Sequence, residues 1–594
     1  MNAPRRLYER IQMGTTHPSP LALVSFFVRS RAFQTKRLIK DTFAPYRPLR
    51  FGTTAEFPFV LAESVSVLRT NIDARERSLL LGKIQNLRVA SQKLHRRVLL
   101  PGEIFSFWRQ VGAPWRMRGF TKGREVREGC VVPTTGGGLC QLSGSLLEVA
   151  LSVDCELIER HCHTALPADV AYDPRRDATL FWNYVDLRFR TPVPILFECY
   201  LTGEALVVRV RGKSPQATTV RIESEPKQGT PLRIGSSCYT CFKTSCLLQC
   251  DPAKEDDAGG RRTAFLIDEP QPEFEAYIGG LIRSRDQLLM QVPSWSAWRG
   301  QFHDRAKTFP LFRFLRAWKL RSTVLRGGTV ARAHFELAAV LARTYCKQIA
   351  YDVEHLCVAQ TLLPHLWKSG VLGARTFDVL MHRLPVKSLE GKLDRASSIY
   401  PECKTLEEFR APKWFAEAEE QALGAARRIV TPHPEIAALF NTSFRLAWMK
   451  STGETRPRTS VEGKDLVVFF GPTLARKGAY AVRDIAREMG FELTLVGSDL
   501  EGADFWRGVR VKRSRSVDLP WHRIHTVLQP ALFDFWPRQL LRAHASGSRL
   551  VISPDCGIQE DRNSGVHHVP FGDTKAAIAI METLLTDRRE MLCV

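Results

Sequence analysis

The sequence predicts an α/β multidomain protein, with an N-terminal α+β domain followed by two Rossmann-like α/β domains. Its 594 residues exceed what one compact core holds, and about three or four domains are expected at this length. Residues 64–213 mix helical periodicity with short β-branched runs. From about residue 263 onward, apolar β-like runs alternate with helical segments, which is typical of parallel sheets covered by helices.

The composition favours a soluble globular chain. Hydrophobic residues make up 44% and charged residues 25%, unlike a disordered or membrane-embedded sequence. The 85 Lys and Arg exceed the 62 Asp and Glu, which gives a formal net charge of +23. Such an excess favours contact with nucleic acid, anionic lipid or phosphorylated sugars without choosing among them. No specific nucleic-acid recognition is predicted.

Residues 1–63 are predicted to form a basic N-terminal segment. Its apolar run LALVSFFV, residues 21–28, is far shorter than the roughly 20 residues of a membrane span, and no small-residue cleavage site follows it. We therefore expect a cytoplasmic protein. The run is expected to form a short surface helix, or to touch the inner face of the membrane peripherally with the flanking Arg and Lys as electrostatic support.

Residues 64–213 are predicted to form the first domain. Helical periodicity dominates residues 64–100. A second helix is expected after Cys140, because Leu142, Leu146 and Val149 recur at three- and four-residue intervals. The β-like segments after that helix are 157–164, 178–189, 194–202 and 205–212.

The stretch TTGGGLCQLSG places a cysteine directly after three glycines, at the expected start of this helix. Glycines allow tight turns and close approach to a ligand, and the free N–H groups of a helix start favour an anion and a thiolate. Cys140 is therefore a candidate nucleophile or metal-binding thiolate. The alternative is a small buried residue that packs a turn.

Several ordered motifs in this region resemble the VanW family domain. They read PGEIFSFWRQVG, GGGLCQLSGSLLEVAL, ELIERHCHT and RRDATLFWNYVDLRFR, and the family pattern is PGE-x-FSF, GGG-x-CQ-x-S, ERH-x-H and DAT followed by DL-x-F. The family is linked by name to vancomycin-type resistance operons, so the resemblance implies a cell-envelope connection. It implies no particular biochemical activity.

His161 and His163 lie two positions apart on an expected strand, so their rings are predicted to point to one face. With Cys140 they are candidates for a nucleophile and its base, or for three ligands of a metal site. Asp177 is a candidate to orient a histidine through its second ring nitrogen. The alternative is a structural strand whose histidines satisfy hydrogen bonds. Two further polar candidates are Glu103 and Gln141.

Residues 214–262 are predicted to be a linker that carries four cysteines in the pattern C-x2-C-x4-C-x3-C. The four are Cys238, Cys241, Cys246 and Cys250. Thiolates at such separations surround a structural zinc ion, and an iron–sulfur cluster uses the same type of ligand. Unbound reduced thiols and disulfides are the alternatives. Since VanW-type chains often carry a Cys-rich tail, the resemblance implies that part of this cluster belongs to the first domain.

Residues 263–455 and 463–594 are predicted to form the two α/β halves, separated by the polar stretch STGETRPRTSVEGKD. A long helix is expected over 331–351. The expected strands are 262–269, 466–471, 491–497, 525–530 and 549–554.

This part of the chain resembles a GT-B glycosyltransferase of the retaining, group-1 type, most clearly in FFGPTLARKGAYAVRDIARE and LQPALFDFWPRQLLRAHASGSRLVISPDCGI. In this family a lysine after a glycine loop contacts the donor diphosphate, and Lys477 occupies that place after Gly471. A cation beside a helix N-terminus suits phosphate. The family's arginine directly after the glycine is Pro472 here, and Arg476 lies nearer the lysine.

The family also carries two glutamates eight positions apart, and the matching residues are Asp534 and Arg542. The resemblance implies that Asp534 lies near the donor sugar. An arginine accepts no hydrogen bonds from ribose hydroxyls, so Arg542 departs from ordinary nucleotide-sugar binding. Either the donor carries an extra phosphate that Arg542 meets, or the domain has lost catalysis and kept a binding role.

The leading functional prediction is a bacterial VanW-like and glycosyltransferase-like fusion protein. It would transfer a sugar to, or bind, an envelope glycan or its precursor, with a nucleotide-sugar or a phosphorylated glycan as its partner. One alternative is a Cys140-dependent acyl or peptidyl transferase or hydrolase whose GT-B-like half only binds carbohydrate. Another is a non-enzymatic scaffold for assembly.

Overall fold

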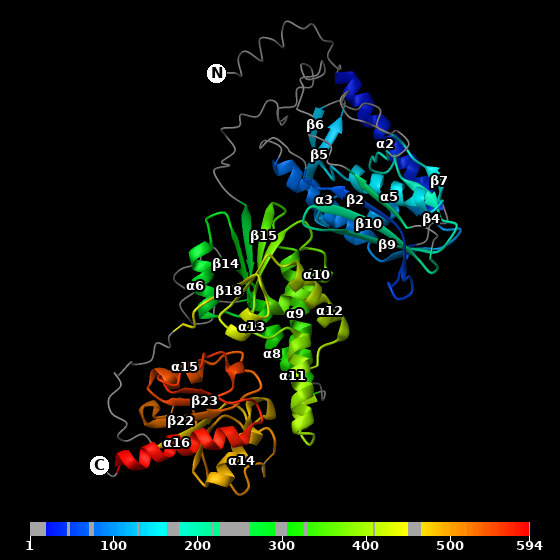
Figure 1. Ribbon diagram of the computed structural model, residues 1–594. Helices are drawn as coiled ribbons and strands as arrows, with labels where there is room; N and C mark the ends of the chain where they lie inside the picture. The colour runs from blue at the N-terminus through cyan, green and yellow to red at the C-terminus, as the bar shows by residue number, and fades with distance from the viewer. Residues whose placement is uncertain are drawn as a thin grey trace, which may run out of the picture. The chain divides into compact units, whose positions relative to one another are not determined.

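The computed structural model describes thirteen stretches of the chain, which form two compact units (Figure 1). Unit 1 comprises residues 1–262, 346–355 and 369–376, and unit 2 comprises residues 263–345, 356–368 and 377–594. The described residues are 20–43, 48–69, 77–127, 130–162, 177–215, 219–224, 261–291, 306–325, 330–407, 410–449, 465–502, 504–516 and 518–592.

Unit 1 is built on a six-stranded sheet with the order β1-β3-β9-β10-β2-β11. Neighbouring strands run antiparallel, except that β11 pairs with β2 in parallel. The strands are β1 (Arg50–Phe51), β2 (Phe59–Val67), β3 (Arg97–Leu99), β9 (Ile195–Leu201), β10 (Ala205–Gly212) and β11 (Val220–Ser224).

Two helices, α3 (Arg77–Leu94) and α5 (Cys140–Ser152), provide the apolar face that packs in the core of unit 1. The helix predicted over residues 64–100 is wrong in its first part, because β2 continues to Val67 and α3 begins only at Arg77. Burial in β2 alternates between Ser64 and Ser66, as a strand with one buried face requires. The β-branched valines of β2, Val60, Val65 and Val67, favour that extended backbone.

Smaller elements complete unit 1. A three-stranded antiparallel sheet has the order β4-β8-β7, and β5 and β6 form a hairpin. The bounds are β4 (Ile104–Ser106), α4 (Phe107–Val111), β5 (Lys122–Arg127), β6 (Cys130–Thr135), β7 (Glu156–Glu159) and β8 (Arg188–Arg190). The prediction that His161 lies on a strand is wrong, since β7 ends at Glu159. The Glu159 carboxylate accepts the Asp186 backbone N–H at 3.2 Å, so a side chain takes the place that a further strand residue would fill.

Unit 2 contains two sheets. The first has the order β14-β13-β12-β15-β16-β17-β18 and the second the order β21-β20-β19-β22-β23-β24. In the second sheet every neighbouring pair is parallel. The strands are β12 (Arg262–Leu266), β13 (Gln287–Met290), β14 (Ala306–Thr308), β15 (Val353–Ala359), β16 (Thr376–Leu380), β17 (Arg428–Thr431), β18 (Ser443–Arg445), β19 (Leu466–Phe470), β20 (Leu493–Val496), β21 (Val511–Ser514), β22 (Ile524–Gln529), β23 (Arg549–Ile552) and β24 (Val566–His568).

Helices cover both faces of the second sheet (Figure 1). Along β19, Val467 and Phe469 pack with α14 and α16, whereas Val468 and Phe470 pack with α15 on the other face. The helices of unit 2 are α6 (Pro272–Leu281), α8 (Pro310–Leu325), α9 (Val330–Cys346), α10 (Leu363–Lys368), α11 (Val386–Ile399), α12 (Lys413–Ala425), α13 (Pro434–Ala438), α14 (Ala479–Met489), α15 (Arg538–Ala545) and α16 (Thr574–Leu592). The predicted fold class, an α+β domain followed by two Rossmann-like α/β domains, is confirmed.

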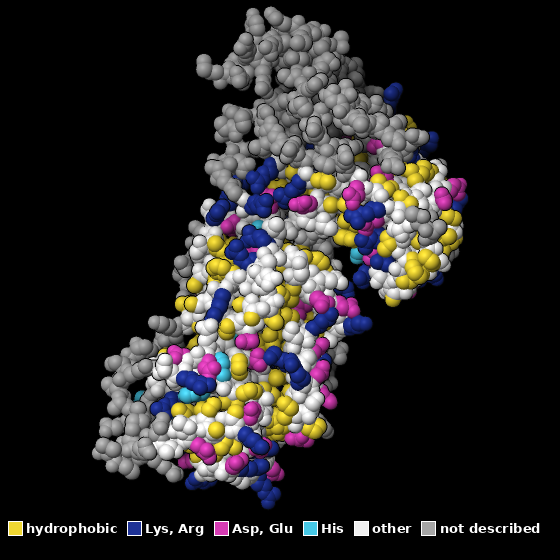
Figure 2. Space-filling model, in the orientation of Figure 1, with side chains coloured by type: hydrophobic (Ala, Val, Ile, Leu, Met, Phe, Trp, Pro, Cys, Tyr) yellow, Lys and Arg dark blue, Asp and Glu magenta, His cyan; other side chains and the backbone are white. Residues whose placement is uncertain are grey.

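The N-terminal segment holds a long helix, α2 (Pro20–Phe43), which belongs to unit 1. Within the described stretches, no helix is both long and apolar enough to cross a bilayer. On the face drawn in Figure 2, Lys and Arg side chains are scattered with Asp and Glu among them rather than gathered into one stripe. The linker with the four clustered cysteines, apart from its flanking residues, and most of the polar stretch 451–465 lie outside the described residues.

Candidate functional site

The glycine triplet of unit 1 is shaped by close packing within the chain. Gly136 and Gly138 have φ angles of 83° and 91°, which residues with a side chain rarely adopt. A Cβ added at Gly137 would lie 2.5 Å from the carbonyl oxygen of Gly123 in β5. The buried Asn86 of α3 donates to the Gly137 carbonyl at 3.0 Å. The triplet therefore lets this loop pack against α3 and the β5–β6 hairpin.

Cys140, the first residue of α5, is half-buried. Its Sγ lies 3.8 Å from Thr179 Oγ1. The Thr179 backbone N–H donates to the His161 carbonyl at 2.8 Å, and Ser143 donates to the Ala178 carbonyl at 2.6 Å. Three motifs that are far apart in the sequence, GGGLCQLS, ERHCH and DAT, thus meet at the start of α5.

Of the predicted partners of the thiol, the structure describes His161 and Asp177. The ring of His161 is turned toward the end of β7, with Nε2 3.6 Å from Glu159 Oε1, and 51% of the side chain is exposed. Asp177 is partly buried two positions before Thr179. His163 lies outside the described residues. The side chain in contact with the thiol is the Thr179 hydroxyl, which sequence reasoning missed although the DAT motif contains it.

Glu103 and Gln141 form hydrogen bonds within unit 1. The Gln141 amide donates to Ser66 Oγ at 3.0 Å and to the Val67 carbonyl at 2.9 Å, which fixes α5 to β2. The Glu103 carboxylate accepts the Leu100 N–H at 3.0 Å and so closes a turn. These contacts are structural.

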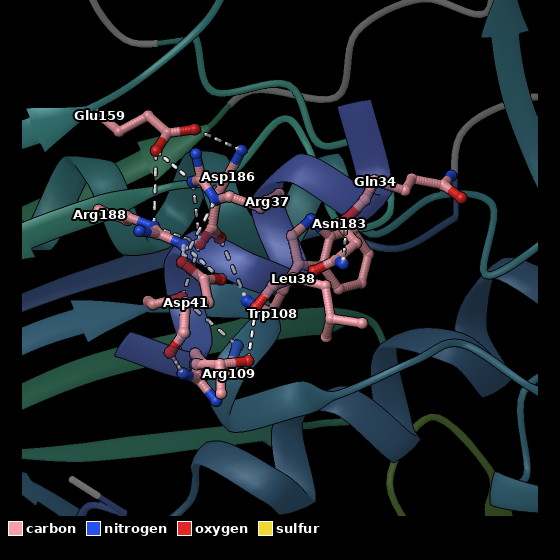
Figure 3. A network of polar contacts seen from close by, with 12 residues as sticks. Gln34, Arg37, Leu38, Asp41, Trp108, Arg109, Glu159, Asn183, Asp186 and Arg188 are labelled. Carbon is pink, nitrogen blue, oxygen red and sulfur yellow. Dashed lines mark hydrogen bonds and ion pairs between the residues drawn. The ribbon is translucent and has the colours of Figure 1, made fainter. Parts of the chain in front are cut away.

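Unit 1 also contains a buried ion cluster that sequence reasoning did not single out (Figure 3). Arg188 of β8 donates to both carboxylate oxygens of Asp41 in α2 at 3.0 Å, and to Asp186 at 2.8 Å. Arg37 of α2 pairs with Glu159 of β7. The cluster joins α2 to the edge of the β4-β8-β7 sheet.

Asp186 lies at the centre of this cluster. It accepts hydrogen bonds from Ser106 Oγ at 2.6 Å and from the Trp108 backbone N–H at 3.1 Å. Burial raises the pKa of Asp186, while Ser106 and the Arg188 guanidinium act in the opposite direction. A signal for this cluster was present, because Glu159 and Asp186 are the acidic residues of the ERH and DL-x-F motifs.

The residues predicted from the GT-B resemblance lie in unit 2, and two of them, Lys477 and Asp534, form an ion pair. Lys477 Nζ lies 3.0 Å from Asp534 Oδ1, and only 17% and 8% of the two side chains are exposed. Gly471 follows β19 with a φ of 100°, and the methylenes of Lys477 lie 3.9 Å from where its Cβ would be. Gly471, Lys477 and Asp534 therefore share one place, at the carboxyl ends of β19 and β22. Ligands of open parallel sheets bind at this edge.

Asp534 is held from several sides. The Gln529 amide donates to Oδ2 at 3.2 Å, and the Trp536 backbone N–H donates to Oδ1 at 3.2 Å. The Asp534 backbone N–H donates to the Asp555 carbonyl at 3.2 Å. These hydrogen bonds within the chain therefore fix the position of the carboxylate.

Another carboxylate of the chain occupies the loop before α14. Glu501 accepts the Ala475 backbone N–H at 3.0 Å, the Tyr480 hydroxyl at 3.1 Å and the Thr405 hydroxyl at 2.6 Å. A donor phosphate would be expected to use loop N–H groups of this kind. In this structure the Ala475 backbone N–H donates its hydrogen bond to the Glu501 carboxylate instead.

Arg476 and Arg542 have other described surroundings than the Lys477–Asp534 pair. Arg476 borders a small apolar pocket that Leu393 and Phe533 also line. The guanidinium of Arg542 stacks on Trp521, with Cζ 4.3 Å from the ring centroid. The position that a second family glutamate would hold is therefore filled by a cation packed on an indole ring.

Side chains of the two halves of unit 2 contact each other beside the Lys477–Asp534 pair. His433 stacks on Phe533 with ring centroids 4.5 Å apart, and Trp448 donates to the Gly557 carbonyl at 2.8 Å. Two ion pairs add to these contacts, Arg538 with Glu273, and Lys392 with Asp555 at 2.7 Å. Side chains of the two halves therefore contact each other beside the pair in this structure.

The four clustered cysteines, predicted to bind a metal, lie outside the described residues. In the part of the chain that the structure does describe, no group of three or more His, Cys, Asp or Glu side chains is placed to hold a metal ion. Cys140 and His161 therefore do not form such a group with another described residue.

Comparison with known proteins identifies the N-terminal domain. Residues 82–211 match the model of the family described as VanW like protein, so the chain carries a VanW-like domain. Over 152 residues the chain is 29% identical to a protein of Bacillus subtilis (strain 168) named "Uncharacterized protein YoaR". Over 141 residues it is 30% identical to "Vancomycin B-type resistance protein VanW" of Enterococcus faecalis (strain ATCC 700802 / V583). These matches cover 25% and 23% of this chain and 48% and 51% of the relatives, so the chain spans about half the length of the curated relatives it matches.

Solved structures similar to the chain include the lipopolysaccharide outer core galactosyltransferase WaaB and the sucrose-phosphate synthase of Thermosynechococcus elongatus. Each is 13% identical, the matches cover 55% of this chain and 91% and 90% of those chains, and the TM-scores are 0.33 and 0.35. UGT89C1 of Arabidopsis thaliana, complexed with UDP, is 12% identical over 55% of this chain and 90% of its own, with a TM-score of 0.31. The assignment of Rossmann-like domains rests on the strand order of unit 2.

Proposed function

We propose that unit 2 binds a nucleotide-sugar or a phosphorylated glycan at the Lys477–Asp534 pair. We further propose that the chain transfers a sugar to, or binds, an envelope glycan or its precursor. The observation that carries the proposal is the 3.0 Å ion pair at the carboxyl end of a parallel sheet, beside the loop before α14. Charge-assisted hydrogen bonds of this kind are the strong contacts of phosphate recognition.

The chemistry of the pair supports a ligand with phosphate and hydroxyl groups. A diphosphate competes with Asp534 for the Lys477 ammonium, because it offers more negative charge at the same place. The released carboxylate then accepts hydrogen bonds from sugar hydroxyls, since an ionised carboxylate only accepts. In the proposed bound state, the contacts that His433, Trp448 and Arg538 make beside the pair open to admit the ligand. Transfer of the sugar then requires an acceptor.

The envelope part of the proposal comes from the VanW-like domain. The name of the enterococcal relative links that protein to vancomycin resistance. The charge of +23 agrees with an anionic partner such as a phosphorylated glycan. Unit 1 would then supply acceptor recognition or a second activity, and unit 2 the donor site.

Replacing Lys477 with Met is expected to remove the response of the protein to its nucleotide ligand. The full chain is heated in the presence of UDP, UDP-glucose, TDP-glucose or GDP-mannose, because a ligand at a hundred times its Kd adds about 2.7 kcal/mol of apparent stability. We expect at least one of these to raise the Tm of the natural chain and none to raise that of Lys477→Met.

The matched control is Lys512→Met, which removes an exposed ammonium from β21 of the same sheet. This variant is expected to keep the full shift. The proposal fails if no nucleotide raises the Tm of the natural chain, or if Lys477→Met responds as strongly as the control.

A second candidate function is thiol chemistry at Cys140, favoured by its half-buried place at the first residue of α5. We propose that this thiol reacts selectively. Iodoacetamide at neutral pH is expected to modify Cys140 well before the buried thiols, since burial raises the pKa of Cys155 to about 11 and that of Cys556 to about 12. Peptide mass spectrometry measures the order of modification. Cys162, also half-buried, is the internal comparison, and equal modification of Cys140 and Cys162 would count against a nucleophile.

The proposal for the four-cysteine segment rests on the spacing of its cysteines in the sequence. We propose that Cys238, Cys241, Cys246 and Cys250 hold a structural zinc ion or an iron–sulfur cluster. This site would stabilise the segment that carries the four cysteines, and it takes no part in the chemistry proposed for unit 2.

A further inference from the structure

Helix α2 docks on unit 1 through polar side chains. Arg37 pairs with Glu159, and Asp41 accepts two hydrogen bonds from Arg188 at 3.0 Å (Figure 3). The Gln34 amide also donates to the Trp182 carbonyl at 3.2 Å. A surface helix of a globular protein usually buries its apolar stripe, whereas the described contacts of α2 with the rest of unit 1 are mainly polar, with Phe33 stacked on Tyr184 at 5.9 Å between ring centroids as an aromatic contact.

Among the α2 residues from 28 onward whose side chains the structure describes, several with apolar or small side chains lie on the solvent side. Val28, Ala32, Thr35 and Ile39 recur at intervals of four, three and four, which places them on one face of the helix. All four are exposed, Val28 by 59% and Ile39 by 55%, and the neighbouring Leu38 by 60%. We call the surface formed by Val28, Ala32, Thr35, Leu38 and Ile39 the outer face of α2.

Cations border this outer face. Arg29, Arg31 and Lys36 are exposed on the same helix. Asp41 is the one acidic residue between positions 20 and 43, and it is buried against Arg188. The helix therefore offers solvent an apolar stripe with positive charge around it and no exposed negative charge.

We propose that the outer face of α2 binds the surface of an anionic phospholipid membrane, with the helix lying parallel to the membrane plane. Helices that lie in the interface combine an apolar stripe with Lys and Arg, and their binding adds buried apolar area to attraction for anionic lipid. The positive charge of the helix attracts a negatively charged partner, and the apolar stripe is buried only in a partner that has a hydrocarbon layer. The inference goes beyond the proposed function, because it concerns where unit 1 is held rather than what unit 2 binds.

The test measures how the full chain sediments with lipid vesicles. We expect binding to vesicles of phosphatidylglycerol and phosphatidylcholine in equal parts, weaker binding at high salt, and little binding to phosphatidylcholine alone. The variant Val28→Glu with Ile39→Glu is expected to bind the anionic vesicles at least about tenfold more weakly, since it loses two apolar contacts and gains two repelled charges. The polar contacts that dock α2 are untouched by these changes.

The matched control places two glutamates on other exposed apolar side chains of unit 1, Met117→Glu with Val193→Glu. It is expected to bind like the natural chain. Equal binding by the α2 variant and the control would overturn the proposal, as would an absence of binding by the natural chain. The oligomeric state of both proteins is also measured by sedimentation without vesicles. If the natural chain is a dimer and the α2 variant is a monomer, the outer face binds a second copy of the chain, and the membrane proposal is wrong.

Discussion

Replacing Arg188 with Met is expected to destabilise the edge of unit 1 by about 3–5 kcal/mol, the usual cost of removing one partner from a buried ion pair. The change leaves Asp41 and Asp186 buried with less compensation. Burial already raises the pKa of Asp186, and Arg188 is one of the groups that counter this rise. Without the guanidinium, Asp186 takes up a proton more readily, or the cluster opens to water.

Native-state hydrogen exchange measures this effect locally, which suits a chain of two units. The amides of α2, β7 and β8 are expected to lose protection in Arg188→Met. The control is Arg190→Met on the same strand, whose partner Glu156 is 64% exposed. An exposed pair is worth about 0–1 kcal/mol, so the control is expected to change little. Equal losses in both variants would show that the buried cluster does not stabilise this edge.

The ion cluster also shows why the sequence predicted some of the fold and missed part of the site. The strands of unit 2 were predictable, because continuous apolar runs such as Leu466–Phe470 are typical of strands buried on both faces. The start of α5 was predictable from its glycines and its apolar period. Both signals lie within a short window of sequence.

The partners of Arg188 are separated along the chain. Asp41 lies 147 residues before Arg188, and Glu159 lies in another strand. No local period connects an acidic residue of an N-terminal helix with an arginine of β8. For the same reason the sequence indicated Cys140 and His161 as candidates but not Thr179, which the fold places between them. Contacts of this kind follow from tertiary packing, on which local patterns carry little information.

Unit 2 shows a second consequence of packing. The sequence indicated Lys477 and Asp534 separately, and the fold brings them to 3.0 Å. No local pattern predicted that Glu501 would accept a hydrogen bond from the Ala475 amide, or that Arg542 would stack on Trp521. Each of these contacts pairs a charged group of unit 2 with another group of the chain. The proposed ligand must therefore replace interactions within the chain, which favours a multiply charged ligand over a neutral sugar.

Acidification is expected to destabilise unit 2 through His433, by up to about 3 kcal/mol between pH 6.5 and pH 4. Desolvation lowers the pKa of this buried histidine from 6.5 to about 4, and the nearby Asp534 and Asp555 offset the shift only in part. Between pH 6.5 and pH 4 the His433 imidazole is protonated in the unfolded chain but not in the folded chain. The free energy of unfolding therefore falls as the pH falls toward 4. A difference of this size follows from about 1.4 kcal/mol for each pKa unit.

His433→Leu is expected to reduce this pH dependence, because leucine fills the same space against Phe533 and does not titrate. Unfolding of the full chain by urea is followed across this pH range, with hydrogen exchange in α13 and β22 as the local readout. His365, whose pKa burial also lowers to about 4, leaves part of the dependence in place. His522→Leu, at an exposed position of the same unit, is the control and is expected to keep the whole dependence. If the two variants show the same pH dependence, His433 is protonated equally in the folded and unfolded chain, and its stacking on Phe533 opens in solution.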